Sequence, residues 1–420
     1  MVDGDESETT MFHHHTATIT PFSDNPDFDF EIRNVLGLAV GGGADPGEVL
    51  AATAGIHKND HAGWFGAWQQ LGRRTAEAAQ AAATAGHRVS AAGGFLRASA
   101  YFGVAVNAAS SLKDPAELAP TFREQREAWE AFVANTPMTV QTIDIPYESS
   151  TMPGWFFRPA QTTAAPTLVA VNGSDGSLAG LWASTGAAAL ERGYNVLLFD
   201  GPGQQSQLFE HGVPFRPDWE HVLTPVFDFV AGLDGVDAAR IAVYGISQGG
   251  YWVARALAFE HRFAAGIADP GVVDVSASWT SHLPKSLMKL LDEGQDEKFD
   301  KEMSFGMKFS PGTERTWLFR ARPYGTDGYA ETVNAVRTYT AADVAGQITT
   351  PLLITSPEGE QFWPGQAEQL AALTPNVSTT VRFTAAEGAG EHCQPLARTL
   401  TAQRMFDWLD DQIGSSTSQG

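Results

Sequence analysis

Hydrophobic residues recur at helical spacing through the first third of the chain. Trp64, Trp68 and Leu71 stand at positions i, i+4 and i+7, which is the spacing of one apolar face of a helix. The alanine-rich run 76–85 combines high helix propensity with little bulk, which suits close packing between helices. Helices are predicted at 47–54, 62–85, 90–108 and 121–134. We therefore expect residues 27–136 to form a helical N-terminal domain.

From about residue 138 the pattern changes to short β-rich runs that alternate with helical runs. This alternation is typical of a mostly parallel sheet with helices on both faces. Eight strands are predicted, at 139–145, 154–158, 167–171, 195–199, 240–244, 264–268, 351–355 and 379–383. Helices are predicted between and after them at 178–192, 218–233, 248–259, 365–373 and 396–412. This order predicts an α/β-hydrolase fold, with an eight-stranded and mostly parallel sheet, over 137–413.

The long interval between the sixth and seventh predicted strands has only helical runs. An insertion of this size in a compact domain is usually functional, so we expect 272–345 to form a helical cap over an active site. Aromatic rings and flexible thioethers would give such a cap an adaptable apolar lining. The side chains with a predicted substrate-binding role are Trp279, Met288, Met303 and Met307. Packing between cap and core is the alternative role for them.

Composition and charge narrow the range of partners. Hydrophobic residues make up 43% of the chain and aromatic residues 10%, which is enough for a sizeable buried core. The 27 Lys and Arg residues stand against 49 Asp and Glu residues, so the net charge is −22. Such a charge repels phosphate backbones and anionic membrane surfaces. A small-molecule substrate is therefore expected as the partner, and neither nucleic acid nor a membrane.

The two ends of the chain lack the hydrophobic periodicity that predicts helices and strands elsewhere. Residues 1–26 are acidic and predicted to be flexible, without the basic and apolar regions of a secretory signal. Residues 414–420 form a Ser- and Gly-rich tail that is also predicted to be flexible. No run of 18 or more apolar residues predicts a membrane-spanning helix, and Cys393, the single cysteine, allows no internal disulfide. A cytoplasmic location is therefore expected.

The strongest chemical signal is the run Gly245-Ile246-Ser247-Gln248-Gly249. It lies directly between a predicted strand and a predicted helix, which is the setting of a nucleophilic serine on a sharp turn. Such a serine adopts a strained backbone conformation, and side chains at Gly245 and Gly249 would collide across the turn. We therefore predict that Ser247 is the nucleophile.

A nucleophilic serine needs a base, and a base needs an acid to orient it. His392 lies in a glycine-flanked loop after the last predicted strand, where the histidine arrives in this fold. Glu360 follows the preceding predicted strand and has the register expected of the acid. Asp269 and Glu358 stay open as alternative acids, and Asp269 could instead contact substrate because it ends a strand near the serine.

The reaction also needs N–H donors for a negatively charged oxygen. The N–H of Gln248, directly after the serine, is expected to supply one of them. The second is expected from the loop 172–176, with the N–H of Ser174 preferred and that of Asp175 in reserve. This chemistry needs no metal ion or organic cofactor.

Together these residues resemble the α/β-hydrolases that carry a helical N-terminal domain, in particular the 2,6-dihydroxypseudooxynicotine hydrolase type and the fungal heptaketide hydrolases. The resemblance covers most of 27–413. It rests on 64–68, 90–101, 172–176, 200–203, 245–250, 360–366 and the pair His392-Cys393. The resemblance implies a Ser-His-acid triad that cleaves a carbon–carbon bond beside a carbonyl, and a homodimer. Enzymes of this fold also hydrolyse esters, lactones and amides, and an Asp more often stands where Glu360 stands here.

The function predicted from these features is a serine hydrolase. Its substrate would be apolar, aromatic or polyketide-like, and the bond broken would be a C–C bond next to a ketone or an ester or lactone bond. An acyltransferase or cyclase on the same scaffold is the first alternative. A non-catalytic binding protein is the second, although such a protein has no need of a serine, a histidine and an acid in these three positions.

Overall fold

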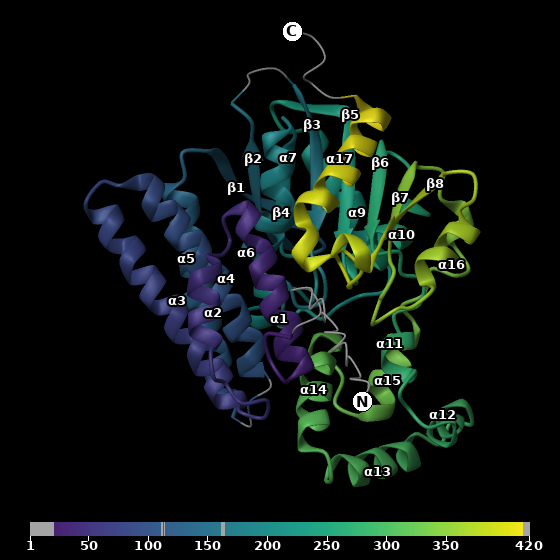
Figure 1. Cartoon of the computed structure of the whole chain (residues 1–420). Helices are drawn as coiled ribbons and strands as arrows, with labels where there is room; N and C mark the ends of the chain where they lie inside the picture. Colours follow the sequence, from purple (N-terminus) through teal and green to yellow (C-terminus); the bar gives the residue numbers. More distant parts are fainter. Residues whose placement is uncertain (1–20, 111, 113, 161–163, 415–420) are drawn as a thin grey trace, which may run out of the picture.

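The computed structural model describes residues 21–110, 112, 114–160 and 164–414. The predicted flexible segments at 1–26 and 414–420 therefore lie mostly outside the described residues. Where the chain is described, it folds around one central sheet with helices on both faces and a layer of helices at one end (Figure 1).

Eight strands form the sheet, in the order β1-β2-β4-β3-β5-β6-β7-β8. They are β1 Thr139–Tyr147, β2 Ser150–Arg158, β3 Ala165–Val171, β4 Asn195–Phe199, β5 Val236–Ile246, β6 Ala265–Asp269, β7 Leu352–Pro357 and β8 Ser378–Phe383. Only the pairs β1–β2 and β2–β4 are antiparallel. Strands β3, β4, β6 and β7 are buried at every position, as expected for parallel strands that helices cover on both faces. The predicted fold class is confirmed.

Alternate residues of the central strands enter two separate cores, one on each face of the sheet. Val169 of β3 belongs to one core and its neighbour Leu168 to the other. The first core includes residues of α9 Glu220–Ala231, α10 Gly249–Leu257 and α16 Gln366–Leu373. The second includes residues of α6 Leu178–Leu181, α7 Ala187–Glu191 and α17 Arg398–Ile413. This alternation of side chains between the two cores holds the strands in register, because a shift by one residue would move every side chain to the opposite face of the sheet.

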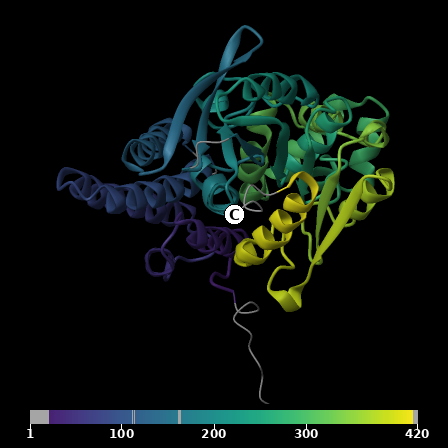
Figure 2. The ribbon, with the colours of Figure 1, turned by 90° about the horizontal axis from the view of Figure 1, so that it is seen from above.

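The N-terminal helices pack beside the β1–β2 end of the sheet, as the purple and blue segments of Figures 1 and 2 show. They are α1 Pro26–Gly37, α2 Pro46–Thr53, α3 His61–Thr84, α4 Arg88–Ser110 and α5 Leu118–Asn135. Trp129 of α5 meets Trp155 of β2 edge to face, with 5.8 Å between ring centroids. Both rings are almost fully buried. These aromatic contacts fix the helical layer to the sheet.

Helix α4 is unusually apolar. Its segment Arg88–Ala109 is long and apolar enough to cross a membrane, but 72% of the relevant window is buried inside the protein. In this structure α4 is therefore a core helix of the helical layer.

The segment between β6 and β7 folds into helices beyond the carboxyl ends of the strands (Figure 1, green). They are α11 Ala277–Thr280, α12 Lys285–Asp292, α13 Asp296–Met307, α14 Pro311–Ala321 and α15 Tyr329–Arg337. Residues of α11 and α14 line the same cavity as the turn after β5, so this segment covers that end of the sheet.

The Trp129–Trp155 contact gives the first testable prediction. Trp129→Ala should lower the free energy of unfolding by about 3–5 kcal/mol, because it leaves a large cavity between the helical layer and β2. Val89→Ala is the control, since Val89 is 75% exposed and its loss should change stability by less than about 0.5 kcal/mol. Urea unfolding measures both, and equal effects of the two changes would contradict the prediction.

Candidate active site

The turn between β5 and α10 has the shape that the glycine pattern predicted. Ser247 has a φ of 58°, in the left-handed region that side chains rarely adopt. A Cβ atom on Gly245 would lie 2.1 Å from the carbonyl oxygen of Gly249, so no larger residue fits there. The N–H of Ser247 donates to the carbonyl oxygen of Asp269 at 2.6 Å. The turn is therefore held in a strained conformation by the adjacent strand β6.

Three side chains from three different loops form a hydrogen-bonded row. Nε2 of His392 lies 2.9 Å from Oγ of Ser247. Nδ1 of the same ring lies 2.8 and 2.9 Å from the two carboxylate oxygens of Glu360. The side chains of His392 and Glu360 are only 6% and 7% exposed. The N–H of His392 also donates to Oε1 of Gln361, which ties the histidine loop to the loop after β7.

Glu360 is held in its charged form. Burial alone would raise its pKa, but His392 and two backbone N–H donors together outweigh burial. The N–H groups of Phe362 and Trp363 donate to one carboxylate oxygen, at 2.9 and 3.2 Å. The net result is a pKa below the usual value for a glutamate. A charged carboxylate at Nδ1 fixes the orientation of the imidazole ring.

The two alternative acids lie elsewhere. The carboxylate of Glu358 accepts from the N–H of Ala385 at 2.9 Å and faces Arg382 at 3.5 Å on the surface. Asp269 is fully buried, and within the described part of the chain neither acid has a hydrogen bond to His392. The structure therefore brings only Glu360 of the three to the histidine.

The predicted contact between Asp269 and substrate is corrected. Its carboxylate accepts from the hydroxyls of Tyr244 and Thr355, at 2.9 and 2.6 Å, and lies 3.6 Å from Arg398. Asp269 is not among the residues that line the cavity. Its side chain is turned into the core beneath the site, where it joins β5, β6, β7 and α17.

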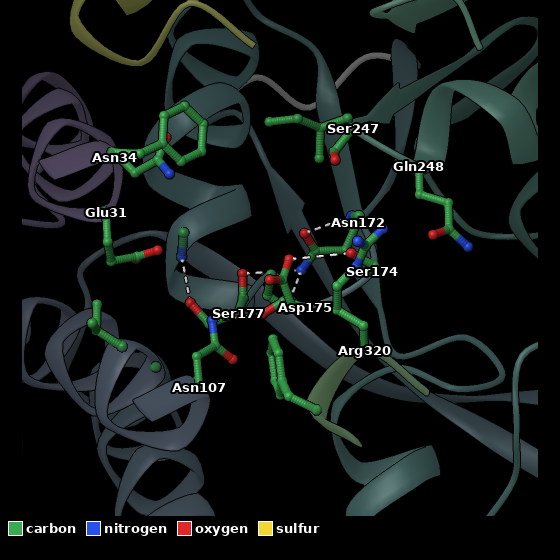
Figure 3. A pocket seen from close by; sticks show the side chains of 18 of the residues that line it. Glu31, Asn34, Asn107, Asn172, Ser174, Asp175, Ser177, Ser247, Gln248 and Arg320 are labelled. Atoms are coloured by element: carbon green, nitrogen blue, oxygen red, sulfur yellow. Dashed lines mark hydrogen bonds between the residues drawn. The ribbon is translucent and has the colours of Figure 1, made fainter. Parts of the chain in front are cut away.

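The loop after β3 passes directly against the serine. A Cβ atom on Gly173 would lie 2.9 Å from Cβ of Ser247, so a bare backbone is needed for this approach. The side chain of Asn172 accepts from the N–H of Gly173 and donates to the carbonyl oxygen of Gly176 at 2.8 Å, which folds the loop around it (Figure 3).

The predicted N–H donors lie beside this serine. Ser174, Asp175 and Gln248 all line the same cavity as Ser247. Within the described residues, the structure gives no acceptor for the N–H of Gln248 or Ser174. Both donors are therefore unengaged in a cavity beside the serine, as expected of groups that stabilise a developing oxyanion.

A cavity of about 450 Å³ opens above Ser247. Its walls come from the helical layer, from the strand ends and from the cap. The aromatic side chains that line it are Phe28, Phe30, Trp64, Phe209, Trp279, Phe319, Tyr324, Phe362 and Trp363. Its size and its mostly apolar lining suit a small organic molecule.

The structure corrects the predicted cavity positions of the three methionines, and the substrate-binding role of Trp279 stays a prediction. Trp279 lines the cavity, whereas Met288, Met303 and Met307 do not. Met303 and Met307 are buried in the hydrophobic core that includes Phe299, and Met288 packs against the same core. Their apolar side chains join the cap helices to one another and to the core, which was the alternative role.

Sequence reasoning missed one wall of the cavity, the helix α1. Glu31 and Asn34 of this helix line the cavity, and Figure 3 shows both facing it. The signal was present: Asn25 caps the helix and Pro26 follows at its first position, as helix starts prefer. The apolar residues Phe28, Ile32 and Val35, at i, i+4 and i+7, then form the buried face.

The site holds no set of side chains suited to a metal ion. Among the described residues, no group of three or more His, Cys, Asp or Glu side chains could bind one.

Known proteins resemble the chain over nearly its whole length. An α/β-hydrolase of Xenoacremonium sinensis, xenA, is 30% identical in an alignment that covers 93% of this chain and 97% of the length of xenA. The 20-hydroxy-prefusarin hydrolase FUS2 of Gibberella moniliformis is 27% identical over 91% of this chain and 96% of its own. Residues 183–307 match the prolyl oligopeptidase family.

The fold has a close counterpart among solved structures. The crystal structure of 2,6-dihydroxy-pseudo-oxynicotine hydrolase covers 90% of this chain and 95% of its own, with a TM-score of 0.71 and 20% sequence identity. The resemblance inferred from the sequence is therefore confirmed. With the eight-stranded sheet, the serine on its sharp turn and these full-length relatives, the chain belongs to the α/β-hydrolase family.

Proposed function

We propose that the protein is a serine hydrolase in which Ser247, His392 and Glu360 act as a catalytic triad on a carbonyl group. The observation that carries the proposal is the buried hydrogen-bonded row from Oγ of Ser247 through His392 to the carboxylate of Glu360. The row ends in a cavity large enough for a substrate. A serine, a base and an acid in hydrogen-bond contact are the parts that acyl transfer requires.

The proposed reaction begins with the transfer of a proton from Oγ of Ser247 to Nε2 of His392. Oγ attacks the carbonyl carbon, and the N–H groups of Gln248 and Ser174 stabilise the oxyanion. His392 then protonates the leaving group, which departs and leaves an acyl group on Ser247. Water, activated by the same histidine, releases the acid product and restores the serine. Glu360 holds the ring and stabilises its positive charge.

The proposed substrate is apolar, and aromatic or polyketide-like. The ring of aromatic side chains around the cavity supports this class, because flat apolar molecules bury well against such walls. The relative named 20-hydroxy-prefusarin hydrolase supports it too. The leaving group of an ester or lactone is an alcohol. The leaving group in C–C bond cleavage is a carbanion, whose charge a neighbouring ketone must delocalise. Both routes use the same acyl-enzyme. The homodimer and the cytoplasmic location stay predictions.

The most direct test of the reaction is product analysis by mass spectrometry. An aryl ester, a macrolactone and an aryl 1,3-diketone are offered to the wild type and to Ser247→Ala. We expect at least one of them to be hydrolysed by the wild type, and the rate to fall by about 10⁴-fold or more in Ser247→Ala. Diketone cleavage identifies a C–C hydrolase, and ester or lactone cleavage alone identifies an esterase. Equal rates in both proteins would exclude the serine mechanism.

Added alcohol separates hydrolysis from acyl transfer in the same experiment. If the acyl-enzyme discharges to water, the acid dominates the products. An ester product that dominates at low alcohol concentration would instead favour the acyltransferase alternative.

A second prediction concerns Glu360. Because its pKa in the folded protein lies below the usual 4.5, its ionised form stabilises the folded state above that pH. This stabilisation is lost as the pH falls through the folded-state pKa. The difference in unfolding free energy between wild type and Glu360→Gln should therefore shrink as the pH falls below about 5. Chemical unfolding at several pH values measures this difference.

The same variant tests the role of the acid in catalysis. Glu360→Gln should lower kcat by about 10³–10⁴-fold, because a neutral amide holds the wrong tautomer of His392. Glu358→Gln is the matched control, two residues away and at the surface, and should retain wild-type activity. Similar losses in both variants would rule out Glu360 as the triad acid.

A further inference from the structure

Glu31 of α1 presents a carboxyl group to the cavity. Figure 3 shows its side chain pointing into the space beside Asp175. Asp29, two residues earlier on the same helix, is bonded to Arg33 at 2.8 Å. Within the described part of the chain, the structure gives Glu31 neither a hydrogen bond nor an ion pair. Its acceptor capacity is therefore unused.

A second carboxyl group faces the same space. Asp175, on the loop beside Ser247, accepts from the hydroxyl of its neighbour Ser174, at 3.3 Å, and from its own backbone N–H. Its backbone carbonyl accepts from the side chain of Asn107 of α4, at 3.4 Å, which places the loop against the helical layer. Both Glu31 and Asp175 keep part of their surface open to the cavity. A ligand in the cavity can therefore reach both carboxyl groups.

The cation on the cap does not neutralise both acids. Burial raises the pKa of Asp175, and the positive charge of Arg320 of α14 offsets this rise only in part. The Arg320 guanidinium donates to Oγ of Ser278 at 3.0 Å and lies over the ring of Trp279, 4.4 Å from the centroid. The guanidinium is therefore engaged with the cap, and among the described residues it forms no ion pair with Glu31.

Withdrawal from bulk water makes the Glu31 carboxylate costly to the protein on its own. Burial raises the pKa of Glu31 to about 7, and the negative charge of Asp175 raises it further. Burial also raises the pKa of Asp175. Glu31 loses part of its hydration and, within the described residues, gains no hydrogen bond in return. Groups of this kind in a substrate cavity are typically completed by a ligand.

We propose that Glu31 and Asp175 bind a protonated amine of the substrate while its carbonyl group lies at Ser247. An ammonium group supplies the donors that Glu31 lacks and the positive charge that two adjacent carboxylates attract. The position of the carbonyl rests on the proposed function, whereas the binding of the amine does not. The substrate class is thereby narrowed to an apolar carbonyl compound with a basic nitrogen away from the bond that breaks.

The test measures binding rather than turnover. Three probes of one shape are titrated into the full-length protein at pH 8: 4-phenylbutylamine, 4-phenylbutan-1-ol and 4-phenylbutyrate. At this pH a carboxyl group with a pKa of about 7 is mostly ionised. We expect the amine to bind about tenfold or more tightly than the alcohol, and the carboxylate to bind most weakly. Equal affinity for amine and alcohol, or tighter binding of the carboxylate, would overturn the proposal.

Two variants of α1 locate the effect. Glu31→Gln should weaken amine binding about tenfold and leave alcohol binding within twofold of wild type. Asp27→Asn is the matched control, because Asp27 also lines the cavity and lies one turn earlier on the same helix. It should leave the amine affinity within twofold. An unchanged amine affinity in Glu31→Gln, or equal losses in both variants, would contradict a specific role for Glu31.

The design separates this proposal from the proposed function. The probes contain no cleavable bond, so amine binding is measured even if no substrate is hydrolysed. Ser247→Ala should bind the amine as wild type does, although it should not hydrolyse esters. Circular dichroism and the melting temperature show whether each variant is folded. If Glu31→Gln does not fold, Asp175→Asn provides a second variant, which should also lower the affinity for the amine.

Discussion

The backbone carbonyl of Asp269, at the end of β6, accepts hydrogen bonds from both the Ser247 turn and the loop that carries His392. It accepts the N–H of Ser247 at 2.6 Å on one side and Sγ of Cys393 at 3.2 Å on the other. The serine turn and the histidine loop are 145 residues apart in sequence, yet both are fixed against this atom. Because a hydrogen bond between Ser247 and His392 requires both loops in place, this shared anchor sets the geometry of the site.

The anchor is itself held by a buried polar network. The carboxylate of Asp269 is bound by Tyr244 of β5 and Thr355 of β7, and Arg398 at the start of α17 faces it. The histidine loop leads into α17, so Arg398 places the helix that follows His392 against strand β6. The two hydroxyl donors fix the position of the Asp269 carboxylate in the core. Asp269, which the sequence offered as an alternative acid, thus supports the loops that position Ser247 and His392.

The sequence predicted the fold, and it marked Ser247 and His392 as candidates, because the signals for both are local. Strand β5, the turn at Ser247 and helix α10 each follow from residues that are adjacent in the chain. The choice among Glu360, Glu358 and Asp269 could not be made in the same way, because it depends on which loop the histidine loop meets. Met303 and Met307 were misplaced for a similar reason. Their apolar character predicts burial, but composition does not say against which neighbours.

The helical layer matters to the site as well as to stability. Through α1 and α4 it forms a wall of the cavity that neither the sheet nor the cap supplies. Glu31, the polar group on that wall, was missed because an amphipathic helix rich in acids at the edge of a domain predicts only a solvated face. Tertiary packing brings this face against the loop of Asp175. The substrate is thus expected to lie among three parts of the chain that are distant in sequence.

The central claim, that Ser247 is a nucleophile activated by His392, is tested most directly by labelling with a fluorophosphonate. Peptide mapping by mass spectrometry identifies the modified residue, and the rate of labelling is compared between wild type and His392→Ala. The account predicts a single adduct on Ser247 that forms about 10³-fold or more slowly without the histidine. An adduct at another residue, or an equal rate in both proteins, would contradict it.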